Sequence, residues 1–416
     1  MRSKLPLLSA LSVGAVVLAC QTYDFEPVEP LAIAQTTVEE VINARRSKPN
    51  IMMLVDTSGS MTLPVNPGPS CDVEFEGSMV PCGYDAVCNV DICPTRWTAL
   101  QAVVPDFLRN SGPFVRFALT TYPETRGGSG VADLCRESTP SALLKTLPAQ
   151  EDDDSLLAHA NEINTLLQQI PNGGPGQPVG GTPTSGSLRF VREQAGLVDP
   201  DRANFVILLT DGLPNCNANN ANQGTDIERC KCTIAGNGCR GGYLQNGCLD
   251  EDASVAEVRA LADRGVKTIV IGFGSETATG DGPAVLNAMA RAGGFARQCD
   301  AQNSCGADDT CNPTTGLCNR AFFQAANQAE LAQALEDISK AVVNPEPCLI
   351  PLEGPQRPSD PKLLVVYVDG VRTTSSDSTW SFEEAGVLFT GETCQRILNS
   401  TPESPVKIEV RAIRQR

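Results

Sequence analysis

An unbroken apolar segment, Ile51–Val55, is the feature that most constrains the fold of this chain. A run of this length without a polar residue is typical of a strand buried on both faces, as in a parallel sheet covered by helices. The chain then turns polar, with Asp56, Ser58 and Ser60 in an Asp-x-Ser-x-Ser pattern. Because such sheets bind ligands at the carboxyl ends of their strands, the pattern places one carboxylate and two hydroxyls at a ligand edge. An ordinary polar turn remains open, since Asp, Ser and Gly are common in turns.

Two later segments also supply hydroxyl and carboxylate oxygens. Thr182 follows two glycines in a Gly- and Pro-rich stretch, and the apolar run Phe205–Leu209 leads through Thr210 to Asp211. Carboxylate and hydroxyl oxygens are ligands that a hard divalent cation accepts. In this order the three segments resemble the metal-ion-dependent adhesion site of von Willebrand factor A domains, the family that includes the integrin inserted domain. The resemblance covers residues 48–343 and implies Mg²⁺, or else Mn²⁺ or Ca²⁺, held by five residues: Asp56, Ser58, Ser60, Thr182 and Asp211.

Apolar runs alternate with helical periodicities along residues 48–344. This alternation predicts an α/β fold with a doubly wound, mostly parallel sheet flanked by helices, and the resemblance implies that this sheet is of the von Willebrand factor A type. The expected strands are 51–55, 114–122, 205–209, 266–273 and 321–325, and the expected helices are 97–108, 156–170, 184–194, 253–264, 284–292 and 329–343. Residues 345–416 show short alternating runs instead, which predicts a small carboxy-terminal β module.

Cysteine-rich loops interrupt this pattern. Most of the 17 cysteines cluster in loop-like segments at irregular spacings, which favours disulfides in a secreted protein over zinc knuckles. Three clusters define a first excursion (residues 62–94), a second (215–249) and a third (299–318), and we expect the pairing to occur within each excursion. Cys348 and Cys394 are the only cysteines of the β module and are expected to pair.

The amino-terminal end has the order of a secretory signal. Arg2 and Lys4 precede an apolar run from Leu5 to Ala19 that is too short to span a bilayer. The run ends in Val17-Leu18-Ala19-Cys20, which resembles the lipobox of bacterial lipoproteins. The resemblance implies a signal peptide at 1–19 and a lipidated tether at 20–47, acylated at Cys20, and we expect a short amphipathic helix over 36–46 of that tether. Several acyl chains would anchor the protein stably. An unmodified cysteine after an ordinary signal is the alternative.

The amino-acid composition limits the partners and the activities that this protein can have. The net charge of −17 disfavours nucleic acid and anionic membrane surfaces. The single histidine, His159, lies within a predicted helix, so a Ser-His-Asp or Cys-His arrangement is hard to assemble and we expect no enzyme. The acidic run at 151–154 is best explained as the start of the helix that follows, because carboxylates stabilise a helix amino terminus. A calcium site is the alternative explanation.

The family resemblance implies an adhesin that binds a carboxylate of a protein or substratum ligand through the metal. It also implies that the last helix, 329–343, shifts with the state of the metal loops, although a rigid domain remains open.

The layout is similar to that of bacterial surface lipoproteins that act in gliding motility, which implies partners in an envelope or motility complex. We expect anchoring in the outer membrane by the amino-terminal lipid, and favour the cell surface over the periplasmic face. The alternative function is a structural or scaffolding subunit of an envelope complex that binds a protein partner in the periplasm.

Overall fold

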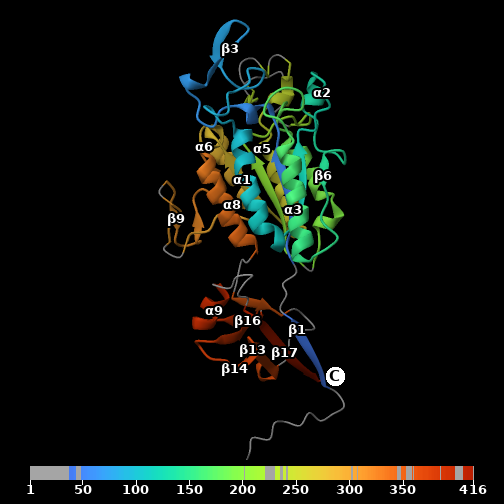
Figure 1. Ribbon diagram of the computed structural model, residues 1–416, viewed down its shortest axis with the longest axis vertical. Helices are drawn as coiled ribbons and strands as arrows, with labels where there is room; N and C mark the ends of the chain where they lie inside the picture. Colours follow the sequence, from blue (N-terminus) through green and yellow to red (C-terminus); the bar gives the residue numbers. More distant parts are fainter. Residues whose placement is uncertain are drawn as a thin grey trace, which may run out of the picture. The chain divides into compact units, whose positions relative to one another are not determined.

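The computed structural model describes residues 37–43, 48–200, 202–220, 230–234, 238–239, 242–300, 303–306, 308–343, 348–352, 358, 360–384, 386–398 and 406–415. The expected signal peptide and Cys20 lie outside these residues. The chain divides into two compact units. The larger unit comprises residues 45–347, and the smaller unit joins residues 348–416 to the segment that precedes residue 45 (Figure 1).

A six-stranded sheet forms the centre of the larger unit, in the order β11-β8-β7-β2-β5-β6. Five strands are parallel, and only the edge strand β6 runs antiparallel to its neighbour. β2 and β7 are buried at every residue, as their continuous apolar sequences predict. The strands are β2 (Asn50–Asp56), β5 (Arg116–Tyr122), β6 (Leu143–Lys145), β7 (Asn204–Thr210), β8 (Val266–Phe273) and β11 (Phe323–Ala325).

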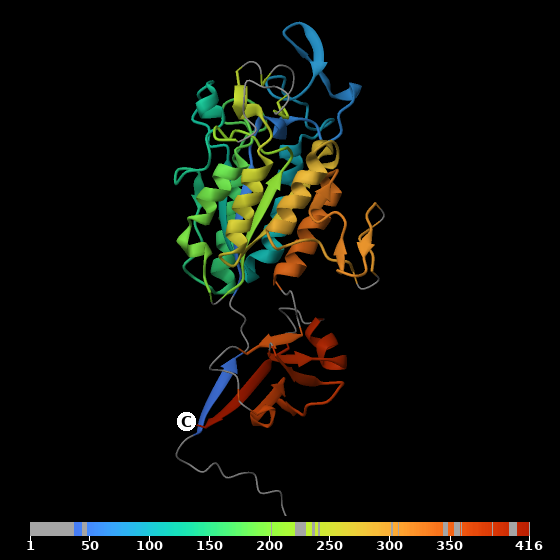
Figure 2. The ribbon, with the colours of Figure 1, turned by 180° about the vertical axis from the view of Figure 1, so that it is seen from behind.

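Helices cover both faces of this sheet, which confirms the predicted fold class (Figures 1 and 2). One face carries α1 (Arg96–Ser111), α3 (Asp153–Gln168) and α8 (Gln328–Val343). The other carries α4 (Thr184–Arg192), α5 (Glu251–Ala262) and α7 (Gly282–Ala292). Successive residues of β2 point to opposite faces, so Met53 belongs to one core and Leu54 to the other. Burial of each such side chain contributes about 1.5–3 kcal/mol, which holds β2 firmly in the middle of the sheet.

Acidic residues do start α3, as the sequence predicts. The Asp152 side chain accepts a hydrogen bond from the Ser155 amide at 2.9 Å, and Asp153 and Asp154 occupy the first turn. Two shorter helices, α2 (Val131–Leu134) and α6 (Ser275–Ala278), follow β5 and β8.

Disulfides tie down the excursions. The first excursion holds Cys71–Cys93 and Cys82–Cys88 around the hairpin of β3 (Asp72–Phe75) and β4 (Ser78–Pro81). The third forms a second hairpin from β9 (Cys311–Asn312) and β10 (Leu317–Cys318). The remaining internal pairs are Cys230–Cys248, Cys232–Cys239, Cys299–Cys311 and Cys305–Cys318.

One bond contradicts the expectation of pairing within each excursion. Cys216 of the second excursion bonds Cys135, which lies in the segment between β5 and β6. The second excursion has five cysteines, an odd number, and so requires one partner from elsewhere. This disulfide joins loops that are 81 residues apart in the sequence.

The smaller unit consists of two sheets that share one apolar core, including Val366, Val387, Phe389 and Val410. One sheet has the order β1-β17-β13-β14, from β1 (Thr37–Asn43), β17 (Ile408–Gln415), β13 (Leu364–Val368) and β14 (Val371–Thr373). The other has the order β12-β16-β15, from β12 (Leu349–Pro351), β16 (Gly386–Phe389) and β15 (Trp380–Glu383). Cys348 pairs with Cys394 as expected.

One expectation about this unit is wrong. The segment expected to be a helix over 36–46 contains the strand β1, which pairs along its length with β17. The carboxy-terminal strands confirm the predicted β module, and a helix near its end, α9 (Gly391–Leu398), carries Cys394. Among the described residues, no helix combines the length and apolar character needed to cross a bilayer.

Candidate metal centre

The predicted site lies where the winding of the sheet changes direction. β2 pairs with β5 on one side and with β7 on the other, so the chain continues from β2 in both directions across the sheet. Asp56 is the last residue of β2, and Asp211 follows the last residue of β7. The two carboxylates therefore meet at the carboxyl edge, the position at which open α/β sheets bind ligands.

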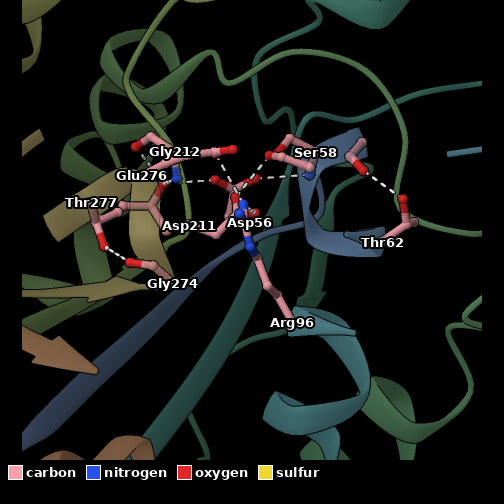
Figure 3. A network of polar contacts seen from close by, with 12 residues as sticks. Asp56, Ser58, Thr62, Arg96, Asp211, Gly212, Gly274, Glu276 and Thr277 are labelled. Atoms are coloured by element: carbon pink, nitrogen blue, oxygen red, sulfur yellow. Dashed lines mark hydrogen bonds and ion pairs between the residues drawn. The ribbon is translucent and has the colours of Figure 1, made fainter. Parts of the chain in front are cut away.

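Short hydrogen bonds connect the residues of this edge (Figure 3). Asp56 Oδ1 accepts from the Ser58 amide at 2.8 Å, and Asp56 Oδ2 accepts from Thr210 Oγ1 at 2.7 Å. Ser60 Oγ donates to Asp211 Oδ1 at 2.9 Å and lies 3.0 Å from Ser58 Oγ. Asp56 and Asp211 are both 0% exposed. Two carboxylates and two hydroxyls are thus gathered in a small region with little access to water.

Thr182 belongs to the same cluster. A Cβ atom built on Gly212 would lie 3.8 Å from Ser60 Oγ and 3.9 Å from Thr182 Oγ1, which places these two hydroxyls on the same side of the Asp211 loop. The main chain of Thr182 is fixed by Asn215, whose amide donates to the Thr182 carbonyl at 2.9 Å and whose Oδ1 accepts from the Thr182 amide at 2.7 Å. The structure therefore brings all five predicted residues together.

Main-chain hydrogen bonds join the loop after β2 to the loop that carries Thr182. The Gly59 amide donates to the Gly180 carbonyl at 3.0 Å, and the Val179 amide donates to the Thr57 carbonyl at 2.9 Å. Gly180 has a φ of +101°, and a Cβ there would lie 2.5 Å from the Leu134 carbonyl oxygen. Only glycine satisfies both conditions, which explains the first glycine of the Gly-Gly pair before Thr182.

Sequence reasoning missed Arg96 and Glu276. Arg96 Nη1 lies 2.6 Å from Asp211 Oδ2 and 3.0 Å from Glu276 Oε2, and the arginine side chain is only 4% exposed (Figure 3). Arg96 starts α1, and Glu276 lies in α6, after β8. No spacing in the sequence links these two residues to Asp211, since a first-turn arginine ordinarily points to solvent.

Burial dominates the electrostatics of the centre. Burial, and after it the charge of Asp211, raise the pKa of Asp56 to about 7. Burial also raises the pKa of Asp211, against the opposing effect of its ion pair with Arg96. The charge of Asp56 is therefore poorly compensated by the protein itself. Two carboxylates and three hydroxyls are an all-oxygen donor set that suits Mg²⁺ or Mn²⁺, and such a cation would supply the missing positive charge.

Two tyrosines from the excursions border the centre. The Tyr84 ring of the first excursion lies 3.1 Å from the position of a Cβ on Gly59, and the Tyr84 amide donates to Thr62 Oγ1 at 2.7 Å. Tyr243 of the second excursion lies 3.5 Å from a Cβ position on Gly181. Both excursions therefore pack on the loops that carry the predicted metal residues.

No protein-family model matches the chain, and no curated protein matches it in sequence. Among solved structures, it is similar to the pilus adhesin SpaC of Lactobacillus rhamnosus GG, at 17% identity and a TM-score of 0.40 over 89% of this chain and 40% of that chain. It is similar to the PilB minor pilin of Streptococcus sanguinis, at 16% identity and a TM-score of 0.37 over 72% of this chain and 62% of that chain. The manganese-loaded TRAP protein of Plasmodium vivax matches at 15% identity and a TM-score of 0.33, over 73% of this chain and 77% of that chain. The chain spans less than half of the pilus adhesin's length, and these likenesses assign it no activity.

Proposed function

We propose that this protein is an adhesin that holds one divalent cation, Mg²⁺ or Mn²⁺, at the edge formed by Asp56 and Asp211 and binds a carboxylate of its ligand there. The residues that would hold the cation are Asp56, Ser58, Ser60, Thr182 and Asp211. One observation carries the proposal: two fully buried carboxylates lie among three hydroxyls on loops that are fixed to one another by main-chain hydrogen bonds. A metal with an incomplete ligand set would gain a further oxygen from the partner.

We further propose that the protein is a lipoprotein of the outer membrane, anchored through Cys20 and exposed at the cell surface. The first twenty residues support this proposal, because basic residues come first, an apolar run follows them, and the run ends in Leu-Ala-Cys. With the cysteine-rich insertions, this order resembles the gliding-motility adhesin lipoprotein CglB of myxobacteria. On that resemblance the protein would couple a gliding-motility complex to the substratum. We propose that the protein is not an enzyme, because its single histidine makes a Ser-His-Asp or Cys-His arrangement hard to assemble.

Calorimetry tests the metal site. The purified mature protein should bind one Mg²⁺ or Mn²⁺, and the heat of binding should be lost in Asp56→Ala and in Asp211→Ala. His159→Ala is a matched control, because His159 Nε2 lies 3.0 Å from the Phe117 carbonyl oxygen within the helix and sheet framework, away from the centre. Metal binding by both aspartate variants at the parent affinity would show that the cation site is assigned wrongly.

The location of the protein is tested on intact cells. Added protease should cleave the protein from the surface, and Cys20→Ala should release it from the membrane fraction. Protection from protease in intact cells, combined with cleavage after the outer membrane is permeabilised, would favour a scaffolding subunit in the periplasm instead.

A further inference from the structure

Exposed apolar side chains are concentrated in the first excursion, which borders the candidate metal centre through Tyr84. Ten large apolar residues are exposed among those whose side chains the structure describes. Six of them lie in the first excursion: Phe75, Met79, Tyr84, Val87, Val90 and Ile92. Two others, Val179 and Leu244, lie in the loop before Thr182 and in the second excursion. Scattered single exposures need no explanation, but a concentration of this kind on a soluble surface is typical of an interaction site.

The first excursion is held in place rather than left free. Its two disulfides close it internally, and its four cysteines form a small buried cluster. Gln177 Nε2 donates to the Tyr84 carbonyl at 3.1 Å, and the Val87 side chain lies 2.7 Å from a Cβ position on Gly173. The part of the excursion that carries Tyr84 and Val87 is therefore fixed beside the loop that carries Thr182, and the two disulfides connect the rest of the excursion to it. A partner would lose little binding free energy to ordering this surface.

The negative charge of the first excursion limits the kinds of partner that it can bind. The first excursion contains five acidic residues and neither lysine nor arginine. Four of the acids are exposed, at Glu74, Glu76, Asp85 and Asp91. An acidic surface repels anionic lipid headgroups, and the excursion lacks the tryptophan and basic residues by which loops commonly enter a membrane interface. It attracts lysine and arginine, and it would repel a second copy of this strongly acidic chain.

We infer that the first excursion docks a polypeptide segment of the ligand that combines apolar with basic side chains, next to the carboxylate at the metal. This inference rests on the proposed function for the position of that carboxylate. The ligand would thus present an acidic residue for the cation, with aliphatic or aromatic residues and lysine or arginine nearby. The metal would fix one point of contact, and the excursion would select among the many carboxylates of a cell surface.

Selection from a random peptide phage library on the mature protein with Mg²⁺ tests the inference. The selected peptides should contain one acidic residue together with an excess of apolar and basic residues. A selected peptide should bind Met79→Ser/Val90→Ser/Ile92→Ser about tenfold or more weakly than the parent, measured by fluorescence anisotropy. Glu74→Lys/Glu76→Lys/Asp91→Lys should weaken binding of the same peptide and lower its dependence on salt. Val371→Ser is the matched control, because Val371 is 68% exposed in the smaller unit.

The outcomes separate the two proposals. Peptides that need Mg²⁺ and Asp56 but bind the excursion variants like the parent would overturn the docking inference and leave the metal proposal standing. Peptides that need the excursion but bind equally well in EDTA and to Asp56→Ala would support docking and reject the metal proposal. Flotation of the unacylated Cys20→Ala protein with vesicles of phosphatidylcholine, with and without phosphatidylglycerol, should recover no bound protein. Binding to either vesicle that is lost in the Met79, Val90 and Ile92 variant would overturn the inference in favour of a lipid surface.

Discussion

Asp56 makes the candidate centre sensitive to pH. With the pKa of its carboxyl group raised to about 7 by burial and by Asp211, protons compete with a cation for the same oxygens. The apparent affinity for Mg²⁺ should therefore fall by about tenfold for each pH unit well below 7. Calorimetric titrations at about pH 8 and about pH 6 measure this change. Equal affinities at the two values would contradict a metal-binding Asp56 whose pKa in the metal-free protein is about 7.

The same pKa has a consequence for stability in the absence of metal. The folded-state pKa of Asp56 is raised from 3.8 to about 7, so its protonated form stabilises the fold at low pH, and this contribution is lost as pH rises through that window. Asp56→Asn lacks the titration and is the reference. The melting temperature of the parent relative to this variant should decrease from about pH 4 to about pH 7 in EDTA. Added Mg²⁺ should restore the parent only.

Arg96 is the internal counter-charge of the centre. Its guanidinium lies between Asp211 and Glu276, and removal leaves the buried carboxylate of Asp211 without its partner. Arg96→Ala should destabilise the metal-free protein by about 3–5 kcal/mol, and saturating Mg²⁺ should recover part of that loss. Arg96→Lys should destabilise the protein less than Arg96→Ala, because lysine keeps the positive charge. It should still destabilise it somewhat, because an ammonium group cannot reproduce the contacts of the guanidinium with both Asp211 and Glu276. Urea unfolding with and without Mg²⁺ measures both effects, and a loss independent of metal would assign Arg96 a packing role only.

At the scale of elements, continuous apolar sequence proved the most reliable signal. β2 and β7 were predictable because burial on both faces removes polar residues from the whole strand, and the polar residues that follow them marked the site. β1 was not predictable from the sequence. Its seven residues are of mixed character, and they form a strand only by pairing with β17, which is distant in the sequence. Arg96 and the Cys135–Cys216 bond escaped for the same reason: each contact depends on how distant loops meet in space. The role of the five predicted metal residues remains a prediction.

The packing of α8 on α1 allows a test of the shift that the family resemblance implies for the last helix. Ser111 Oγ of α1 lies 2.7 Å from Ser339 Oγ of α8, so cysteines at both positions should form a disulfide that prevents sliding. If α8 moves with the metal loops, this cross-link should change the affinity for a selected, metal-dependent peptide by several-fold, the range of couplings of about 1–3 kcal/mol. Ser111→Ala/Ser339→Ala controls for the lost hydroxyl contact. An unchanged affinity in the folded, cross-linked variant would indicate a rigid domain.

At the scale of the whole molecule, the disulfides should differ in what they contribute to stability. Cys135–Cys216 closes 81 residues, whereas Cys82–Cys88 closes 6. The chain-entropy relation gives about 4.5 kcal/mol for the long loop and about 2 kcal/mol for the short one. Cys135→Ser/Cys216→Ser should therefore lower the melting temperature more than Cys82→Ser/Cys88→Ser. Mass spectrometry of a nonreducing digest should first verify both bonds in the parent, and free thiols at Cys135 and Cys216 would contradict the pairing.

The pairing of β1 with β17 has a consequence for how tension would travel through the chain. β1 precedes the larger unit in sequence, and its seven residues, Thr37 to Asn43, pair antiparallel with Gln415 to Glu409. In a chain held at its amino-terminal end while a ligand retains the larger unit, the load would run lengthwise along β1. Both ends of this load path lie on β1 itself, so its covalent backbone would carry the tension, and its hydrogen bonds to β17 would not have to break. The smaller unit would then stay folded under tension, although one of its strands transmits the load toward the larger unit.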